Sequence, residues 1–257
     1  MIPKIIHYCW FGGKAKPELA EKCIESWKKF CPDYEIVEWN EDNFDINSNL
    51  YVKQAYEARK FAFVSDYARL YALYTHGGIY MDTDVMLLKP LDEYLSDTAF
   101  MGFEAKGKIA TCVIGSMKSN SLIADFLKYY DERAFITDNG TYDVTTNVET
   151  ITGILLSNGL KPNGHAQTVC EMSIYPQNIF SPSLHKLDNA SYMKDTVAIH
   201  YFSGSWKSDA TKKRESSLWW KIIAVPLSFV SRIMRKLFGD KWEQRKNKIR
   251  DKILKND

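Results

Sequence analysis

Apolar residues follow two different periods along the first fifty positions of the chain. The short apolar runs at residues 2–10 and 34–39 predict β-strands. Between them, apolar residues recur every three or four positions from Pro17 to Phe30, which predicts an amphipathic helix that starts after the proline. The polar stretch at residues 40–49 is typical of a loop.

A second helix and a short strand are predicted further along. Ser65 is the expected N-cap of a helix that runs from Asp66 to His76, and Gly77-Gly78 is its expected stop. The apolar triplet Ile79-Tyr80-Met81 then predicts a short buried strand. This strand leads directly into Asp82-Thr83-Asp84.

Strands and helices continue to alternate after these elements. Strands are predicted at residues 99–104, 109–115, 169–175 and 197–202, and helices at residues 121–132 and 148–158. Alternation of this kind predicts an α/β fold with a mostly parallel, doubly wound central sheet. At 257 residues and 45% hydrophobic content, one such domain with an appendage is expected, and wholesale disorder is excluded.

Cysteine usage and the first residues point to an intracellular protein. The five cysteines include no CxxC pair and no zinc-ligand spacing, and Cys9, Cys112 and Cys170 lie in apolar runs, so we expect buried, reduced thiols. The chain opens with Met-Ile-Pro-Lys directly before a predicted strand, and no apolar stretch approaches the ~20 residues of a membrane span. A cytoplasmic protein without a secretion signal is expected.

Charge is distributed unevenly along the chain. Residues 211–257 contain 14 Lys and Arg against 5 Asp and Glu, so this segment carries +9, while residues 1–210 carry −7. We therefore expect a catalytic domain at 1–210 and a basic amphipathic helical segment at 211–257.

Trp219, Trp220 and interleaved basic residues favour an interfacial helix on the anionic cytoplasmic face of a membrane. The alternative is a helix packed on the domain with a solvated basic face. Nucleic acid is not an expected partner, because the body is acidic and no recognition motif is present.

The candidate chemistry centres on two aspartates. Residues two apart in an extended chain point to the same side, so Asp82 and Asp84 can converge at the end of their strand. Paired carboxylates favour a hard divalent cation such as Mg²⁺ or Mn²⁺. On the preceding helix, Asp66 and Arg69 are three residues apart and share a face. The alternatives are a solvated turn for the aspartates and an ordinary ion pair within the helix.

The sequence around these residues resembles a known family. The stretches IPKIIHYCWFGG and SDYARLYALYTHGGIYMDTD resemble the DxD sugar transferases of glycosyltransferase family 32, of the capsular-polysaccharide and mannosyltransferase type. They are more distantly similar to the glucosyltransferase domains of the large clostridial cytotoxins. The resemblance covers about the first 105 residues well. It implies the two-lobed nucleotide-sugar fold called GT-A.

The resemblance also implies roles for individual residues. It implies that Trp10 stacks on the nucleotide base. It implies that Asp66 and Arg69 contact the donor sugar and its diphosphate, and that Tyr80 lines the same pocket. It further implies that Asp82 contacts the ribose or sugar and shares the metal, and that Asp84 is the main metal ligand. Without the resemblance, Trp10 would be interpreted as a core aromatic residue. The expected catalytic group is therefore Asp66, Arg69, Asp82 and Asp84.

A second candidate site follows the last predicted strand. His200 closes that strand and can supply a nitrogen ligand to Mn²⁺, while Lys207 can offset diphosphate charge. In related retaining transferases a His…Trp loop closes over the donor, which implies that role for Trp206. The alternative is a strand-end histidine whose partners are backbone groups. The other histidines, at positions 7, 76, 165 and 185, have no partner spacing and are expected to be structural or exposed.

These residues together predict a metal-dependent glycosyltransferase with Mn²⁺ or Mg²⁺ as cofactor. The expected donor is a nucleotide sugar, with UDP favoured over GDP, and the expected acceptor is a glycan or lipid-linked glycan of a surface polysaccharide. Family resemblance implies retention of anomeric configuration; an inverting enzyme would need a base, for which Glu104 and Glu149 are both open. Asn147 lies where the family has a polar donor contact.

Two other classes remain as alternatives. One is a catalytically inactive module that binds a nucleotide sugar or carbohydrate. The other is a haloacid-dehalogenase-like phosphatase, which is disfavoured because its motif needs Thr or Val where this chain has Met86.

Overall fold

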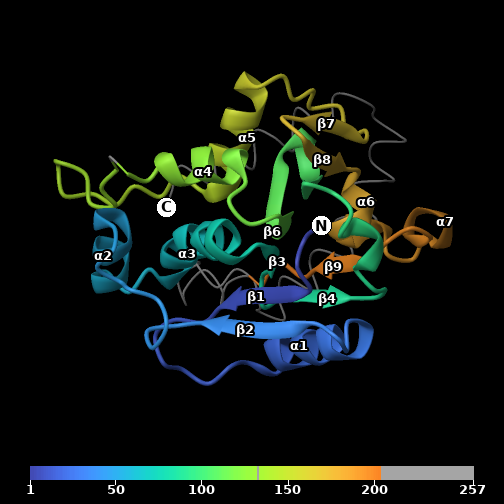
Figure 1. The fold of residues 1–257 in the computed structure, drawn as a ribbon, viewed down its shortest axis with the longest axis horizontal. Coiled ribbons are helices and arrows are strands. Elements are labelled where there is room, and N and C mark those ends of the chain that lie inside the picture. The colour runs from blue at the N-terminus through green and yellow to red at the C-terminus, as the bar shows by residue number, and fades with distance from the viewer. Residues whose placement is uncertain (132, 204–257) are drawn as a thin grey trace, which may run out of the picture. The chain divides into compact units, whose positions relative to one another are not determined.

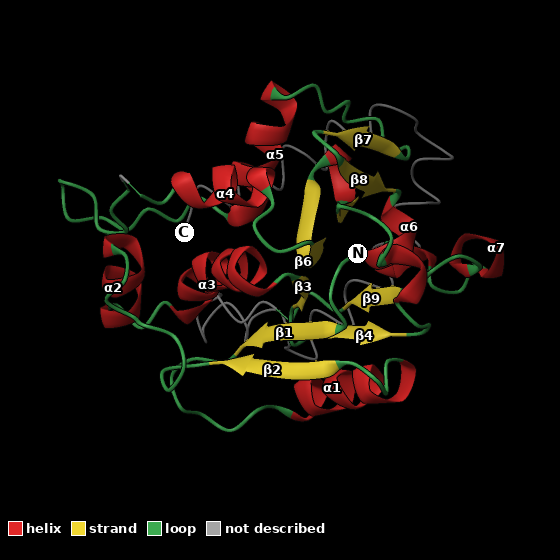
Figure 2. Cartoon of the chain, in the orientation of Figure 1, coloured by secondary structure: helices red, strands yellow, loops and turns green. Residues whose placement is uncertain are grey.

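A seven-stranded sheet organises the part of the chain that the computed structural model describes, residues 1–131 and 133–203 (Figures 1 and 2). Its strands are β1 (Ile5–Cys9), β2 (Glu35–Trp39), β3 (Gly78–Met81), β5 (Ala99–Phe103), β6 (Ile109–Ser116), β7 (Gln167–Val169) and β8 (Met172–Tyr175). They lie in the order β2-β1-β3-β6-β5-β8-β7. Two further strands, β4 (Val85–Leu87) and β9 (Ala198–His200), form a separate antiparallel pair.

The predicted α/β fold with a mostly parallel sheet is confirmed. Strands β1 and β2 are parallel, as are β1 and β3, and β5 and β8, whereas β6 is antiparallel to both of its neighbours. Five of the seven strands therefore run in one direction, and β6 and β7 oppose them. The reversal at β6 follows from the short connection after β5, since a few residues can join antiparallel strands only.

Helices cover both faces of this sheet (Figure 2). The α-helices are α1 (Glu18–Phe30), α2 (Leu50–Glu57), α3 (Phe61–His76), α4 (Ser121–Lys128), α5 (Asn147–Ser157), α6 (Gln177–Phe180) and α7 (Ala190–Met193). Short 3₁₀ turns lie at Asp92–Tyr94, Ala105–Gly107 and Leu184–Lys186. Helices α3, α4 and α5 lie on one side of the sheet and α1 on the other.

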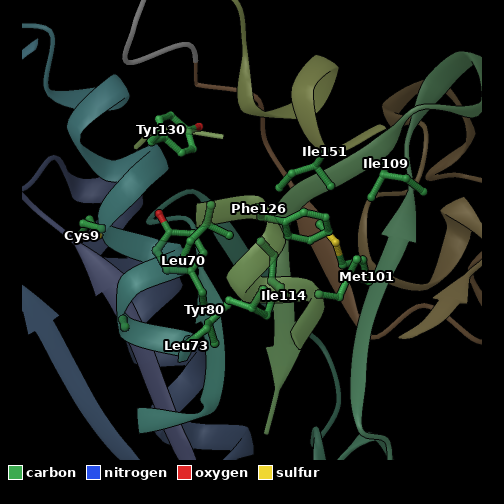
Figure 3. Packing of buried hydrophobic residues seen from close by; sticks show 14 of the residues in the cluster. Cys9, Leu70, Leu73, Tyr80, Met101, Ile109, Ile114, Phe126, Tyr130 and Ile151 are labelled. Carbon is green, nitrogen blue, oxygen red and sulfur yellow. The ribbon is translucent and has the colours of Figure 1, made fainter. Parts of the chain in front are cut away.

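Two apolar layers form the core, one on each face. Leu70 of α3, Phe126 of α4 and Ile151 of α5 pack over Ile114 of β6, as Figure 3 shows. The other layer includes Trp27 of α1 and the residues of β3 that point away from α3. Alternation along β3 makes this division, because successive strand side chains point to opposite faces. Tyr80 therefore lies on the α3 side, where the candidate site is.

The helix before β3 begins earlier than predicted. We expected Ser65 to be its N-cap, but α3 starts at Phe61, and the Ser65 hydroxyl donates to the Phe61 carbonyl at 3.0 Å. A serine inside a helix commonly bonds to the carbonyl four residues back, so its capping preference did not apply here. The expected stop is confirmed, because Gly77 and Gly78 both have left-handed φ values, +69° and +106°.

Three other expectations need correction. Residues 169–175 form a hairpin instead of one strand, because Cys170 and Glu171 both adopt positive φ and turn the chain between β7 and β8. That turn exposes Cys170, which we expected to be buried; Cys9 and Cys112 are buried as predicted, and all five thiols are free. The helix predicted at 121–132 ends at Lys128.

The expected features near the C-terminus lie outside the described residues. These are Trp206, Lys207, the domain boundary at residue 210 and the basic segment 211–257, all of which stay predictions. Within the described part of the chain, every helix is too short or too polar to cross a membrane.

Candidate functional site

Asp82 and Asp84 lie on the tight turn that joins β3 to β4. The Asp82 amide donates to the carbonyl of Cys112 on β6 at 2.9 Å, and the Val85 amide closes the turn on the Asp82 carbonyl at 3.0 Å. The sheet and the turn thus fix the backbone on both sides of Asp82. Asp84 is buried, whereas Asp82 is partly exposed.

His200 reaches the aspartates through the β4–β9 pairing. Val85 is the register partner of His200, so the strand that follows the aspartates carries the histidine beside them. The His200 Nε2 atom lies 3.3 Å from Asp84 Oδ1. One ligand atom from each of Asp82, Asp84 and His200 lies within 4.8 Å of the others. Two carboxylate oxygens and one imidazole nitrogen fit Mn²⁺ or Mg²⁺, so these residues suit the expected cofactor.

The segment after His200 wraps around Asp84. The Tyr201 amide donates to the Asp84 carbonyl at 3.0 Å, and the Ser203 amide donates to Asp84 Oδ2 at 2.7 Å. Burial by itself would raise the pKa of Asp84, but His200 and Ser203 outweigh it and lower that pKa to about 2. Burial also opposes a charge on the histidine, yet Cys112 and Asp84 raise the pKa of His200 above its usual value.

Arg69 joins Asp66 and Asp82 into one buried polar cluster. Its Nη2 atom lies 2.8 Å from Asp66 Oδ1 and 3.5 Å from Asp82 Oδ1. Its Nε donates to the Ser65 carbonyl at 3.2 Å, and its Nη1 donates to the Thr111 carbonyl at 2.9 Å. The arginine is 5% exposed. The predicted ion pair within the helix is present, and the same guanidinium also contacts the DxD turn.

Tyr80 contacts both the guanidinium of Arg69 and the carboxylate of Asp82. Its hydroxyl donates to Asp82 Oδ1 at 2.8 Å, and its ring centroid is 4.6 Å from the guanidinium carbon of Arg69. A cation over a tyrosine ring is a favourable contact, most of all where water is excluded. Burial raises the pKa of Asp66 to about 6, although Arg69 opposes the shift. Arg69 and Tyr80 are two independent partners of the Asp82 carboxylate, and together they hold it in one orientation.

Asn147 approaches the same cluster from α5. Its Nδ2 donates to the Asp66 carbonyl at 3.3 Å, and its buried Oδ1 has no hydrogen-bond partner among the described residues. Asn147 is the first residue of α5, and Thr146 with Glu149 forms a capping box at that helix start. Glu149 is thereby engaged as a cap and pairs with Lys108, which leaves it a structural role in this structure.

Two other candidates lie away from the carboxylates. Trp10 follows β1, is partly exposed, and donates through Nε1 to the Lys14 carbonyl at 2.6 Å. Because β1 and β3 are parallel neighbours, Trp10 and Asp82 follow strand ends at the same edge of the sheet. Glu104 follows β5 at that edge too and is partly buried.

The sequence showed some of this arrangement and missed other parts. It predicted Asp66, Arg69, Tyr80, Asp82 and Asp84 as one group, and the structure brings them together. It did not indicate that the amides of Tyr201 and Ser203 bind Asp84, since a backbone donor carries no sequence signal. Phe202, which packs on His200, was also missed; an aromatic residue inside a small-residue loop was the available signal.

Comparisons with known proteins find a family model that matches part of the chain. Residues 17–101 match the family described as the glycosyltransferase sugar-binding region containing the DXD motif. Over 141 residues the chain is 28% identical to inositol phosphoceramide mannosyltransferase 3 of Schizosaccharomyces pombe, a match that covers 52% of this chain and 38% of that protein. Over 164 residues it is 30% identical to an uncharacterized glycosyltransferase, L373, of Acanthamoeba polyphaga mimivirus, covering 58% and 62%. The chain thus spans less than two thirds of the length of these relatives.

Solved structures of glycosyltransferases are also similar. The PaToxG glycosyltransferase matches with a TM-score of 0.46 and 20% identity over 61% of this chain and 69% of that one. The galactosyltransferase LgtC, in complex with donor and acceptor sugar analogs, matches with a TM-score of 0.42 and 15% identity over 81% and 91%.

Proposed function

We propose that this protein is a metal-dependent glycosyltransferase, because residues 17–101 match the family of DXD sugar-binding glycosyltransferases. It transfers a hexose from a nucleotide-sugar donor, with UDP-sugars favoured, to a glycan or lipid-linked glycan of a surface polysaccharide, with retention of configuration. The observation that carries the proposal is the convergence of Asp82, Asp84 and His200 beside the buried Arg69. A module that binds a nucleotide sugar without catalysis is the alternative, and turnover of the donor distinguishes the two.

The metal ligands would be Asp82, Asp84 and His200. A bound Mn²⁺ or Mg²⁺ supplies Lewis-acid charge to the leaving diphosphate. Asp84 is prepared for this role because its partners keep it ionised at neutral pH. His200 would bind a cation through a neutral Nε2, and because Cys112 and the neighbouring Asp84 raise the pKa of His200, metal binding there would release a proton.

Arg69 acts mainly through Asp66 and Asp82. Its Nε and Nη1 donate to the Ser65 and Thr111 carbonyls, and its Nη2 forms ion pairs with Asp66 and Asp82. Each of the three guanidinium nitrogens thus has a partner within the protein. The proposed role of Arg69 is therefore to orient the two carboxylates, and that of Asp66 is to accept hydrogen bonds from donor-sugar hydroxyls.

Nucleoside-diphosphate release from a panel of UDP- and GDP-sugars tests the proposal. Wild type is assayed with Mn²⁺, with Mg²⁺ and with EDTA, beside Asp84→Asn and the control Asp125→Asn, whose carboxylate lies on α4 and pairs with Lys128. We expect slow, metal-dependent hydrolysis of one donor in wild type and in the control, and none in Asp84→Asn. Donor binding without release, with every acceptor offered, would favour the non-catalytic module.

The membrane location is a separate part of the proposal and rests on the sequence of residues 211–257. Its excess of basic residues and its tryptophans suit an anionic bilayer surface. Full-length protein should float with vesicles that contain phosphatidylglycerol and remain unbound to phosphatidylcholine vesicles. Binding to neither would refute the peripheral location and would leave the transferase proposal intact.

A further inference from the structure

Phe202 combines two unusual properties beside the metal-ligand cluster. Its φ is +52°, in the left-handed region that residues with a Cβ rarely adopt. Its side chain is nevertheless 46% exposed, so burial of the ring does not compensate for the backbone strain. A strained backbone that presents an apolar ring to water is found chiefly at functional sites.

The residues on either side of Phe202 hold it in place. Tyr201 and Ser203 both donate backbone hydrogen bonds to Asp84, so the turn between them cannot relax without releasing that aspartate. The Phe202 ring lies on the His200 ring, with 4.0 Å between centroids and 35° between planes. One face of Phe202 is therefore fixed against a metal-ligand candidate, and the ring presents apolar area next to it.

A second polar group lies at the edge of the sheet that carries the aspartates. Glu104 follows β5, which runs in the same direction as β3, so both strands end at that edge. Glu104 is partly buried there; burial raises the pKa of Glu104, while the charges of His200 and Lys108 oppose the shift.

We propose that Phe202 and Glu104 form a pyranose-binding subsite next to the metal ligands, and that this subsite holds the acceptor sugar. The inference rests on the proposed function. An aromatic ring packs against the apolar C–H face of a sugar, and a carboxylate accepts hydrogen bonds from its hydroxyls. Phe202, which stacks on His200, supplies the first group, and Glu104, at the edge of the sheet that carries the aspartates, supplies the second.

The position favours the acceptor over the donor. The buried polar groups that suit donor hydroxyls, Asp66 and Arg69, gather around Asp82. Phe202 instead stacks on His200, lies in the turn whose backbone binds Asp84, and is 46% exposed. A sugar on Phe202 would thus approach the metal-ligand cluster from outside the buried polar pocket.

The test compares two reactions of one enzyme. Hydrolysis of the donor to water is measured beside transfer to three probes, methyl α-mannopyranoside, methyl β-glucopyranoside and methyl β-galactopyranoside. The variants are Phe202→Gly, Phe202→Tyr and Glu104→Gln. Glycine adopts the left-handed backbone freely, so Phe202→Gly removes the ring while the turn is kept. The control is Tyr74→Ala, an exposed aromatic residue two turns along α3 from Asp66.

We expect Phe202→Gly and Glu104→Gln to raise the KM of the accepted glycoside about tenfold or more, and to reduce transfer by a larger factor than hydrolysis. Phe202→Tyr should restore the KM, and Tyr74→Ala should leave the ratio of transfer to hydrolysis unchanged. Saturation-transfer NMR on the same glycoside should lose its signal in Phe202→Gly.

Three results would overturn the subsite. Equal losses of transfer and hydrolysis would mean that Phe202 and Glu104 only support the metal-ligand cluster. Donor hydrolysis in wild type without acceleration by any of the three glycosides would refute the subsite alone. Failure of wild type to bind or hydrolyse any donor would refute the proposed function and the subsite with it.

Discussion

His7 allows a quantitative test of how β3, the strand that precedes Asp82 and Asp84, is held in the sheet. It is a buried residue of β1, and its Nε2 lies 2.7 Å from the Gly77 carbonyl at the start of β3. Its Nδ1 accepts a hydrogen bond from Trp39 Nε1 at 3.1 Å. A protonated ring would place a second N–H against the Trp39 donor. Neutral His7 with hydrogen on Nε2 is therefore the form that fits this structure.

The expected effect on stability follows from the pKa. Burial lowers the pKa of His7 from its usual 6.5 to about 4, so the folded protein excludes a proton that the unfolded chain binds. Stability is fully present above pH 6.5 and is lost as the pH falls from there toward 4. Between pH 7.5 and pH 5 this single group should reduce the free energy of unfolding by about 2 kcal/mol.

Urea unfolding at a series of pH values measures this contribution as a difference between variants. Other groups titrate in the same range, so the quantity of interest is the pH dependence of wild type minus that of His7→Gln, which retains an N–H donor but does not titrate. His185→Gln is the control, because that histidine is exposed on a 3₁₀ turn. If wild type and His7→Gln lost the same stability between pH 7.5 and pH 5, the inference of a buried neutral His7 would be wrong.

Other parts of the fold and site give further testable expectations. Mn²⁺ at 100 times its Kd should add about 2.7 kcal/mol of stability and raise Tm by roughly 5–10 °C, and Asp84→Asn should remove the shift in a melting assay. Gly78→Ala should cost about 2 kcal/mol or more in urea unfolding, since φ is +106° and a Cβ would lie 2.7 Å from the Ile5 carbonyl. Gly153→Ala, on an exposed face of α5 with open space around it, should instead stabilise by up to about 1 kcal/mol. A thiol reagent should modify one cysteine in the native protein, and Cys170→Ser should abolish that reaction; modification of two or more would contradict the burial of the other four.

The pattern of apolar residues was sufficient for most strands and helices because local period and burial agree there. It was sufficient for β1, α1 and β3, where apolar spacing and the glycine stop are both present in a short window. It was insufficient at Ser65, because a preference for capping competes with helix continuation and only tertiary packing of the preceding turn decides between them. The hairpin at Cys170 was missed since two non-glycine residues with positive φ leave no compositional signal.

The candidate site divides in the same way between local and long-range information. Asp66, Arg69, Tyr80, Asp82 and Asp84 lie within nineteen consecutive positions. Helix spacing predicts that Asp66 meets Arg69 and strand spacing that Asp82 meets Asp84, while the family resemblance joined the two pairs and added Tyr80. His200 is brought to them by the pairing of β4 with β9, across more than a hundred residues. No sequence period encodes that pairing, and the histidine entered the prediction by its place at a strand end and by the resemblance.

Arg69 shows why the two interpretations of the Asp66–Arg69 spacing are not alternatives. An ion pair confined to α3 would need only Asp66, and a buried pair of that kind adds little net stability. Here the guanidinium also reaches Asp82, stacks on Tyr80 of β3 and binds the Thr111 carbonyl of β6, so it links the helix to two neighbouring strands and to the DxD turn. Arg69 pairs with Asp66 and Asp82, and Asp84 has His200 as its partner. With His200 neutral, as the proposed metal site requires, three carboxylates share the charge of one arginine. That deficit would lie at Asp82 and Asp84, beside the His200 ligand atom, and it would favour a cation there.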